Sequence, residues 1–178
     1  MRYTIRSRHL VAALITTVVG IIPWTHGIAS EEVVPSGHAV TITIPDGWER
    51  LTNHISEHTL VVAAERGTGN SLGLLGFEQP NAKYTLNRKE AEKGVLSALG
   101  PNTRILRRTD TKLAGASAYC VIVETEVQGR KISAARIIAD KPVHGFMYVL
   151  QYSKIGGGNF DDASIQKIAN QLRSNESR

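Results

Sequence analysis

The chain has 178 residues, of which 42% are hydrophobic, with a single cysteine and 21 lysines and arginines against 16 acidic residues. This length suffices for one domain with its own core, and a single cysteine excludes an internal disulfide, so packing alone must hold the fold. Three arginines lie within the first eight residues, and the densest later clusters, RILRR and NRKEAEK, are typical of solvated faces. A nucleic-acid-binding protein is therefore not expected.

The first 29 residues have the three parts of a secretory signal peptide. A positively charged stretch precedes the apolar segment from Leu10 to Trp24, and the small residues of THGIAS follow it. Cleavage after Ala29 would leave Gly27 and Ala29 at the two small-residue positions. A retained membrane anchor is disfavoured, because the apolar run is shorter than the ~20 residues that span a bilayer and contains Pro23. We therefore expect an exported protein, periplasmic or secreted, with no stable membrane insertion after cleavage.

Three strands and a helix are predicted in the first half of the mature chain. Residues 38–44 alternate apolar and polar side chains and end at a Pro-Asp-Gly turn. The runs TLVVAAE from Thr59 and SLGLLGF from Ser71 are joined by RGTGN, whose glycines suit an antiparallel hairpin. Residues 87–100 repeat apolar side chains every four positions and end in glycine before a proline, as helices do.

Four strands and a helix are predicted in the second half. The strands span residues 104–109, 117–127, 130–140 and 146–153. Within 117–127, Glu124 and Glu126 share one face and apolar residues the other, which predicts a sheet with one buried and one partly wet face. Residues 161–174 carry an apolar helical stripe behind two aspartates. The order β-β-β-α-β-β-β-β-α predicts an α+β fold, an antiparallel β-sheet with helices packed on it.

The stretch TNHISEHTL contains His54, Glu57 and His58 in the order of a zinc-peptidase signature. That signature requires a helix, on which both imidazoles face one metal ion and the glutamate activates its water. The short segment here lacks helical periodicity, so we predict a connection between strands with both histidines facing solvent. A catalytic metal is not expected. A zinc hydrolase remains the less favoured alternative, and adventitious metal binding by the two histidines stays open.

Two further residues have a catalytic alternative. Ser71 in GNSLG matches G-x-S-x-G, a nucleophile motif that requires a helix after the serine, whereas the strand-like LLGF that follows favours a hairpin. Cys120 lies in an alternating run and is expected to be a semi-buried strand residue, since Tyr119 and Val121 offer nothing that would lower its pKa. No catalytic residue, metal ligand or cofactor is therefore predicted, and the protein is expected not to be an enzyme.

Several segments resemble those of PsbP-like and DcrB-like domains. VTITIPDGWERL is similar to their opening strand and turn, KLAGASAYCVIVETEVQGRKISAARIIAD to their central hairpin, GFMYVLQYS to the next strand, and DDASIQKIANQLRS to their closing helix. The resemblance implies an α-β-α sandwich and a non-enzymatic module that assists or binds other proteins. The resemblance covers most of residues 38–174, and together with the predicted signal peptide (1–29) it leaves an N-terminal segment (30–37), a single domain (38–174) and a tail (175–178).

We accordingly expect an exported, non-catalytic module that binds a protein partner in the cell envelope, without nucleic acid or cofactors. The alternative is a periplasmic inhibitor or immunity protein that blocks a toxin or hydrolase through a loop such as KPVHG or KIGGGNF. Neither the partner nor the biological process can be named from the sequence.

Overall fold

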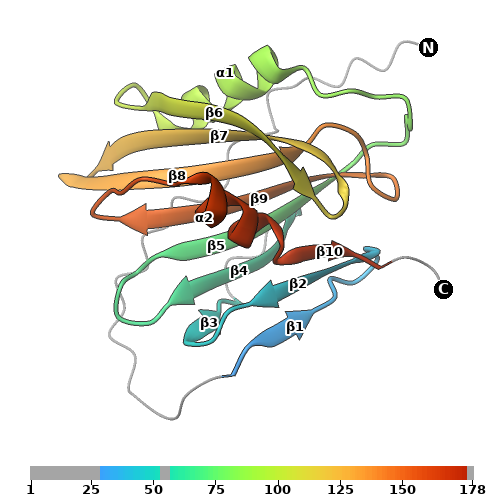
Figure 1. Cartoon of the computed structure of the whole chain (residues 1–178), viewed down its shortest axis with the longest axis horizontal. Coiled ribbons are helices and arrows are strands. Elements are labelled where there is room, and N and C mark those ends of the chain that lie inside the picture. Colours follow the sequence, from blue (N-terminus) through green and yellow to red (C-terminus); the bar gives the residue numbers. More distant parts are fainter. Residues whose placement is uncertain (1–28, 53–56, 176–178) are drawn as a thin grey trace.

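The computed structural model describes residues 29–52 and 57–175, which form two antiparallel sheets and two helices (Figure 1). The strands are β1 (Glu31–Val33), β2 (Val40–Ile44), β3 (Trp48–Arg50), β4 (Thr59–Glu65), β5 (Ser71–Glu78), β6 (Arg104–Leu113), β7 (Ala116–Val127), β8 (Arg130–Ala139), β9 (Phe146–Ile155) and β10 (Leu172–Ser174), and the helices are α1 (Arg88–Leu99) and α2 (Asp162–Ala169). The seven-stranded sheet has the order β3-β4-β5-β9-β8-β7-β6, and the three-stranded sheet the order β1-β2-β10.

Tight turns connect the long strands β6 to β9. Between β7 and β8, Gln128 (φ 50°) and Gly129 (φ 73°) both adopt left-handed backbone conformations, and Val127 pairs with Arg130 directly across the turn. A two-residue turn with positive φ at both positions matches the right-handed twist of the flanking strands. This turn therefore fixes the register of β7 on β8.

Both helices begin at side-chain caps. The Asn87 side chain accepts a hydrogen bond from the backbone N–H of Glu90 (3.3 Å), and the Asp161 side chain accepts one from Ser164 (2.7 Å). Each cap satisfies a backbone donor that the first helical turn leaves without an intrahelical partner. Helix α1 ends at Gly100, whose φ of 87° suits glycine, and Pro101 prevents its continuation.

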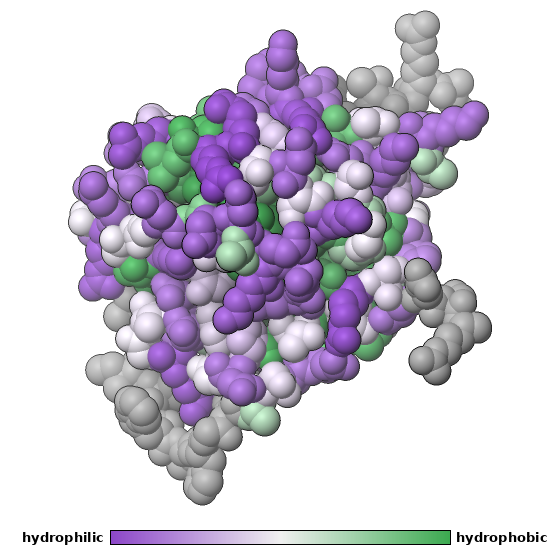
Figure 2. All heavy atoms as spheres, in the orientation of Figure 1, coloured by the Kyte–Doolittle hydropathy of each residue, from purple (hydrophilic) through white to green (hydrophobic). Residues whose placement is uncertain are grey.

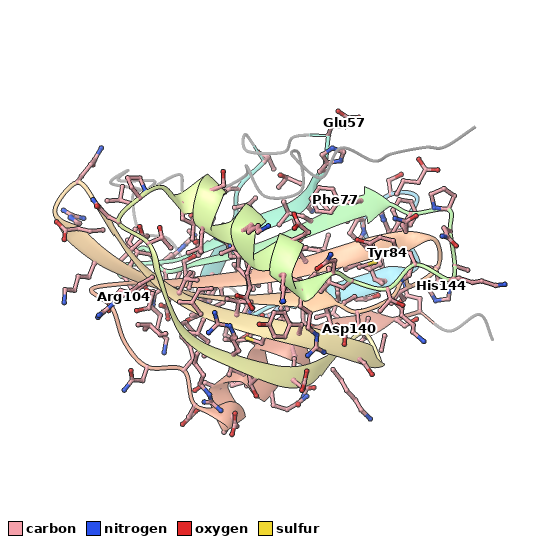
Figure 3. The ribbon with its side chains drawn as sticks, turned by 90° about the horizontal axis from the view of Figure 1, so that it is seen from above. Glu57, Phe77, Tyr84, Arg104, Asp140 and His144 are labelled. Carbon is pink, nitrogen blue, oxygen red and sulfur yellow. The ribbon has the colours of Figure 1, made fainter. Side chains whose placement is uncertain are left out.

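Side chains are buried on both faces of the large sheet. On one face α2 and the small sheet enclose the main core, and on the other α1 covers a second cluster. Figure 3 shows the two helices on opposite sides of the large sheet. The second cluster comprises Val95, Tyr119, Val121, Val123 and Ala134. Burial at about 25 cal/mol per Å² of apolar surface makes these two interfaces the main source of stability.

The predicted α+β class is confirmed, with differences at particular elements. The helix predicted to reach residue 174 ends at Ala169, and the following residues form β10, in which Leu172 pairs with Ile42 of β2. Strands β1 and β3 were not predicted, and β1 lies within residues 30–37, ahead of the predicted domain. The expected wet face of residues 117–127 is wrong for the first half of β7, because α1 and the main core bury opposite faces there.

Candidate partner-binding surface

The described part of the H-x-x-E-H stretch forms a turn before β4. His54 lies outside the described residues, Glu57 is exposed, and the half-buried His58 ring lies 4.8 Å from the Phe77 ring, centroid to centroid. Glu57 and Phe77 lie on the α1 side of the large sheet (Figure 3). The expectation that His58 faces solvent is therefore wrong, because the apolar face of Phe77 provides a packing surface. In residues 29–52 and 57–175, no group of three or more His, Cys, Asp and Glu side chains could hold a metal ion.

The other two residues with a catalytic alternative lie in regular strands. Ser71 opens β5 and pairs with Ala64 of β4, which confirms the predicted hairpin. Cys120 is fully buried rather than semi-buried, and burial raises the pKa of its thiol to about 12. A thiol with such a pKa stays protonated at neutral pH and is a poor nucleophile.

Strand β6 forms one edge of the large sheet. It runs for ten residues and pairs with β7 on one side, while the strand order places it last in the sheet (Figure 1). The register shifts between Ile105 and Arg107, and Leu106 at this bulge is 41% exposed. An edge strand presents backbone N–H and C=O groups that an added strand can use. Leu106 adds an apolar contact at the same edge.

Beside this edge, Arg88 of α1 joins the helix to two strands. Its Nη2 atom lies 2.8 Å from Asp110 Oδ1 and 3.0 Å from Asp140 Oδ2, and its guanidinium carbon lies 4.6 Å from the centre of the Tyr119 ring. The hydrogen bond to Asp140 is the main reason that the pKa of Arg88 is raised above its ordinary value. Arg88 therefore stays charged and ties the start of α1 to the sheet.

Glu92, one helical turn later, is held by two strands. Arg108 donates to both of its carboxylate oxygens, with distances of 2.9 Å from Nε to Oε1 and 2.9 Å from Nη2 to Oε2, and the Tyr119 hydroxyl donates to Oε1. The hydrogen bonds from Arg108, and secondarily that from Tyr119, hold the pKa of Glu92 below its ordinary range. Burial, followed by the bond to Glu92, raises the pKa of Tyr119 to about 12, so its phenol remains neutral at physiological pH.

The remaining arginines of β6 are paired as well. Arg104 donates to Glu124, and Arg107 forms an ion pair with Asp162 at the start of α2. The surface made by β6 and its flanking ion pairs, which we call the β6 edge surface, is therefore charge-balanced. Figure 2, which shows the side of the molecule that bears α2 and β10, likewise displays mainly hydrophilic side chains with small separate apolar patches.

The sequence indicated only part of this surface. The run RILRR was interpreted as a solvated face, which fits its exposed arginines, but pairing with glutamates distant in sequence gave no local signal. The exposure of Leu106 depends on the bulge, which the alternation alone does not reveal. The two loops suggested for an inhibitor are anchored: His144 Nε2 lies 2.9 Å from Ser174 Oγ, and Lys154 lies over the ring of buried Phe160.

Comparisons with known proteins agree at the level of the fold. No protein-family model matches the chain, and no curated protein shows a significant sequence match to it. A crystal structure from Bacteroides thetaiotaomicron VPI-5482 is similar over 83% of this chain with a TM-score of 0.57 and 11% identity, and the chain spans about half (49%) of that structure.

The Ran-binding protein Mog1p of Saccharomyces cerevisiae is similar over 80% of this chain and 83% of its own, with a TM-score of 0.51 and 10% identity. A mutant form of Mog1 matches 81% of this chain and 85% of its own, with a TM-score of 0.50 and 10% identity. The chain has the Mog1/PsbP-like fold. At these identities the likeness concerns the fold alone, and membership of the PsbP-like or DcrB-like family stays a prediction.

Proposed function

We propose that this protein is an exported, non-catalytic module that binds a protein partner through the β6 edge surface. The observation that carries the proposal is the exposed Leu106 at the bulge of a ten-residue edge strand. Elsewhere in the described part of the chain, Val34 is the other large hydrophobic residue that is strongly exposed. Mog1p, which shares the fold, is named as a Ran-binding protein, so this fold is compatible with protein recognition.

Recognition at this edge would follow the mode in which an extended peptide adds a strand to a sheet. Backbone hydrogen bonds supply affinity in that mode, and alternate side chains supply specificity. The paired arginines Arg104 and Arg108 flank Leu106 and discourage indiscriminate pairing, because charged side chains on an edge strand oppose aggregation. A partner strand with an apolar side chain opposite Leu106 would match this pattern.

We propose a non-catalytic role because the candidate nucleophiles of the chain are buried, hydrogen-bonded or part of a regular strand. Cys120 is fully buried with a raised pKa, Tyr119 donates to Glu92, and Ser71 lies in a regular hairpin strand. Among the residues that the structure describes, no histidine is paired with any of these three side chains, as the base of an activated nucleophile would be. Zinc content and hydrolytic activity of the purified protein, compared with those of a His54→Ala, His58→Ala double variant, test this part directly.

Export is proposed from the N-terminal pattern of charge, apolar core and small residues. In the part of the chain that the structure describes, no helix is long and apolar enough to cross a membrane. Cell fractionation followed by N-terminal sequencing should give a mature protein that begins at Ser30. A full-length N-terminus in the cytoplasm would refute export.

The binding site can be tested by placing a photo-crosslinking amino acid at position 106 in cells. Position 34 serves as the matched control, because Val34 is the other exposed large hydrophobic residue and is 60% exposed. We expect one dominant crosslinked protein at position 106 and not at position 34. The purified partner should then bind the wild type and the Val34→Asp variant equally, and the Leu106→Asp variant at least about tenfold more weakly, as for a central interface residue.

Equal crosslinking at both positions, or equal binding by both aspartate variants, would refute the β6 edge surface as the site. The identity of the partner separates the two functional alternatives. A resident envelope assembly supports the accessory role, whereas a toxin or hydrolase whose activity falls on binding supports the inhibitor or immunity role.

A further inference from the structure

Arg136 is a buried cation in the middle of the large sheet. It lies on β8, where it pairs with Val121 of β7 on one side and Gln151 of β9 on the other. Its side chain therefore belongs to the face of the sheet that carries α1, because Val121 packs in the α1 cluster. Arg136 is only 4% exposed, and burial lowers the pKa of its guanidinium to about 10, so it remains charged at neutral pH.

Among the described residues, Arg136 has no carboxylate partner, and its buried Nε atom has no hydrogen-bond acceptor. The half-buried arginines Arg66, Arg88 and Arg107 each pair with an acidic side chain. Residues 1–28 and 53–56 contain no aspartate or glutamate, and Glu176 follows Asn175, whose side chain accepts a hydrogen bond from Thr41 of the small sheet. Since an uncompensated buried charge is strongly unfavourable, a guanidinium in this position suits an anion from outside the chain.

The groups around Arg136 on the same face suit a small amphipathic anion. Gln151 and Ser153 of β9 are both buried, and the Gln151 amide lies 3.2 Å from the Ser153 hydroxyl, which places two polar side chains next to the guanidinium by strand register. The other neighbours on this face by register are apolar or aromatic and lie on β7, β8 and β9: Tyr119, Val121, Val123, Ala134, Ile138 and Val149.

We propose that Arg136 anchors a binding site for a monocarboxylate with an aliphatic body, with Gln151 and Ser153 as neighbouring polar groups. The guanidinium fork matches a carboxylate with two parallel hydrogen bonds. One cation balances one negative charge, whereas a phosphate dianion would need a second. The nearest other arginine by register, Arg108, lies two strands away, roughly 10 Å, and is already paired with Glu92. This inference does not depend on the β6 edge surface or on any protein partner.

The test uses octanoate as the probe, with octanamide as its neutral analogue and inorganic phosphate as the alternative anion. Binding to the purified protein is measured by isothermal titration calorimetry and by the shift in Tm. Arg136→Met removes the charge and keeps a similar volume. Arg130→Met is the matched control, because Arg130 is an exposed arginine on the same strand.

We expect saturable octanoate binding that is about 10- to 100-fold weaker for octanamide and for Arg136→Met, and unchanged for Arg130→Met, as expected when a charge-assisted hydrogen bond is lost. Without any ligand, Arg136→Met should raise Tm by about 2 °C or more, because it removes an uncompensated buried charge. Arg136→Lys, which keeps the charge but loses the fork, should bind octanoate more weakly than the wild type.

Three results would overturn the proposal. They are the absence of octanoate binding to the wild type, equal binding by Arg136→Met and the wild type, and tighter binding of phosphate than of octanoate. Loss of partner binding in a Leu106→Asp variant that still binds octanoate would leave this site intact. The failure of the two proposals can thus be told apart.

Discussion

Replacing Glu92 by glutamine should destabilise the protein at neutral pH and much less in acid. The substitution keeps the size and an acceptor oxygen but removes the charge that Arg108 and Tyr119 share. The Tyr119 hydroxyl is buried, so changing its charge-assisted bond to a neutral one should cost about 1 kcal/mol. The bridge to Arg108 adds little, since the Arg108 side chain is 53% exposed and solvent screens the pair.

The expected loss in unfolding free energy is therefore about 1 kcal/mol at pH 7, measured by urea denaturation. The pKa of Glu92 is lowered in the folded protein, so the ionised carboxylate contributes its stabilisation fully above the ordinary value of 4.5. That contribution is lost as pH falls through the lowered pKa. The difference between wild type and Glu92→Gln should thus shrink on titration from pH 5 towards pH 3.

Glu90→Gln is the matched control. Glu90 lies on the same helix in an exposed ion pair with Lys93, which is worth at most about 0.5 kcal/mol. A cost for Glu92→Gln no larger than that for Glu90→Gln at pH 7, or a cost that does not change between pH 7 and pH 3, would refute the role assigned to the Glu92 charge.

Three further predictions concern the core, the buried thiol and a turn. Leu150→Ala should lower the unfolding free energy by about 2–5 kcal/mol in urea denaturation, because Leu150 is fully buried, while Leu106→Ala should change it by no more than about 0.5 kcal/mol. Iodoacetamide at pH 8 should leave Cys120 unmodified in intact-mass spectra until urea unfolds the protein, and stoichiometric labelling of the native protein would contradict its burial. Gln128→Asn should raise Tm, because asparagine tolerates the φ of 50° better, and a lower Tm would argue against this turn conformation.

The sequence was most informative where local chemistry alone decides the structure. The antiparallel hairpin between Thr59 and Phe77 follows from two apolar runs separated by glycines, and α1 follows from its period and its terminal Gly-Pro. These features need no knowledge of distant residues, and the structure places the elements as predicted.

The predictions were wrong where tertiary packing decides. In the sequence, Leu172 continues the apolar stripe of the preceding helix. In the structure, Leu172 is buried in β10, where pairing with β2 provides hydrogen bonds for the backbone. Strands β1 and β3 have three residues each, which is too short for periodicity to be detected. His58 shows no sequence signal for its contact with Phe77, because the two are brought together by the turn before β4.

The functional candidates depended even more on pairing across the fold. Arg136 looks like one more charge in an alternating run, and only the registers of β7, β8 and β9 show that it stands between two buried strands. Likewise, the exposure of Leu106 follows from a bulge and from the position of β6 at the end of the strand order. Strand order is a global property, so a single sequence gives little access to it.

Hydrogen–deuterium exchange of the complex with the crosslinked partner tests the central claim most directly. If the partner adds a strand to the large sheet, amides within residues 104–112 should become protected, while those of the loops at 141–145 and 154–160 exchange as in the free protein. Protection confined to those two loops, with unchanged exchange along β6, would contradict binding at the β6 edge surface and favour the inhibitor alternative.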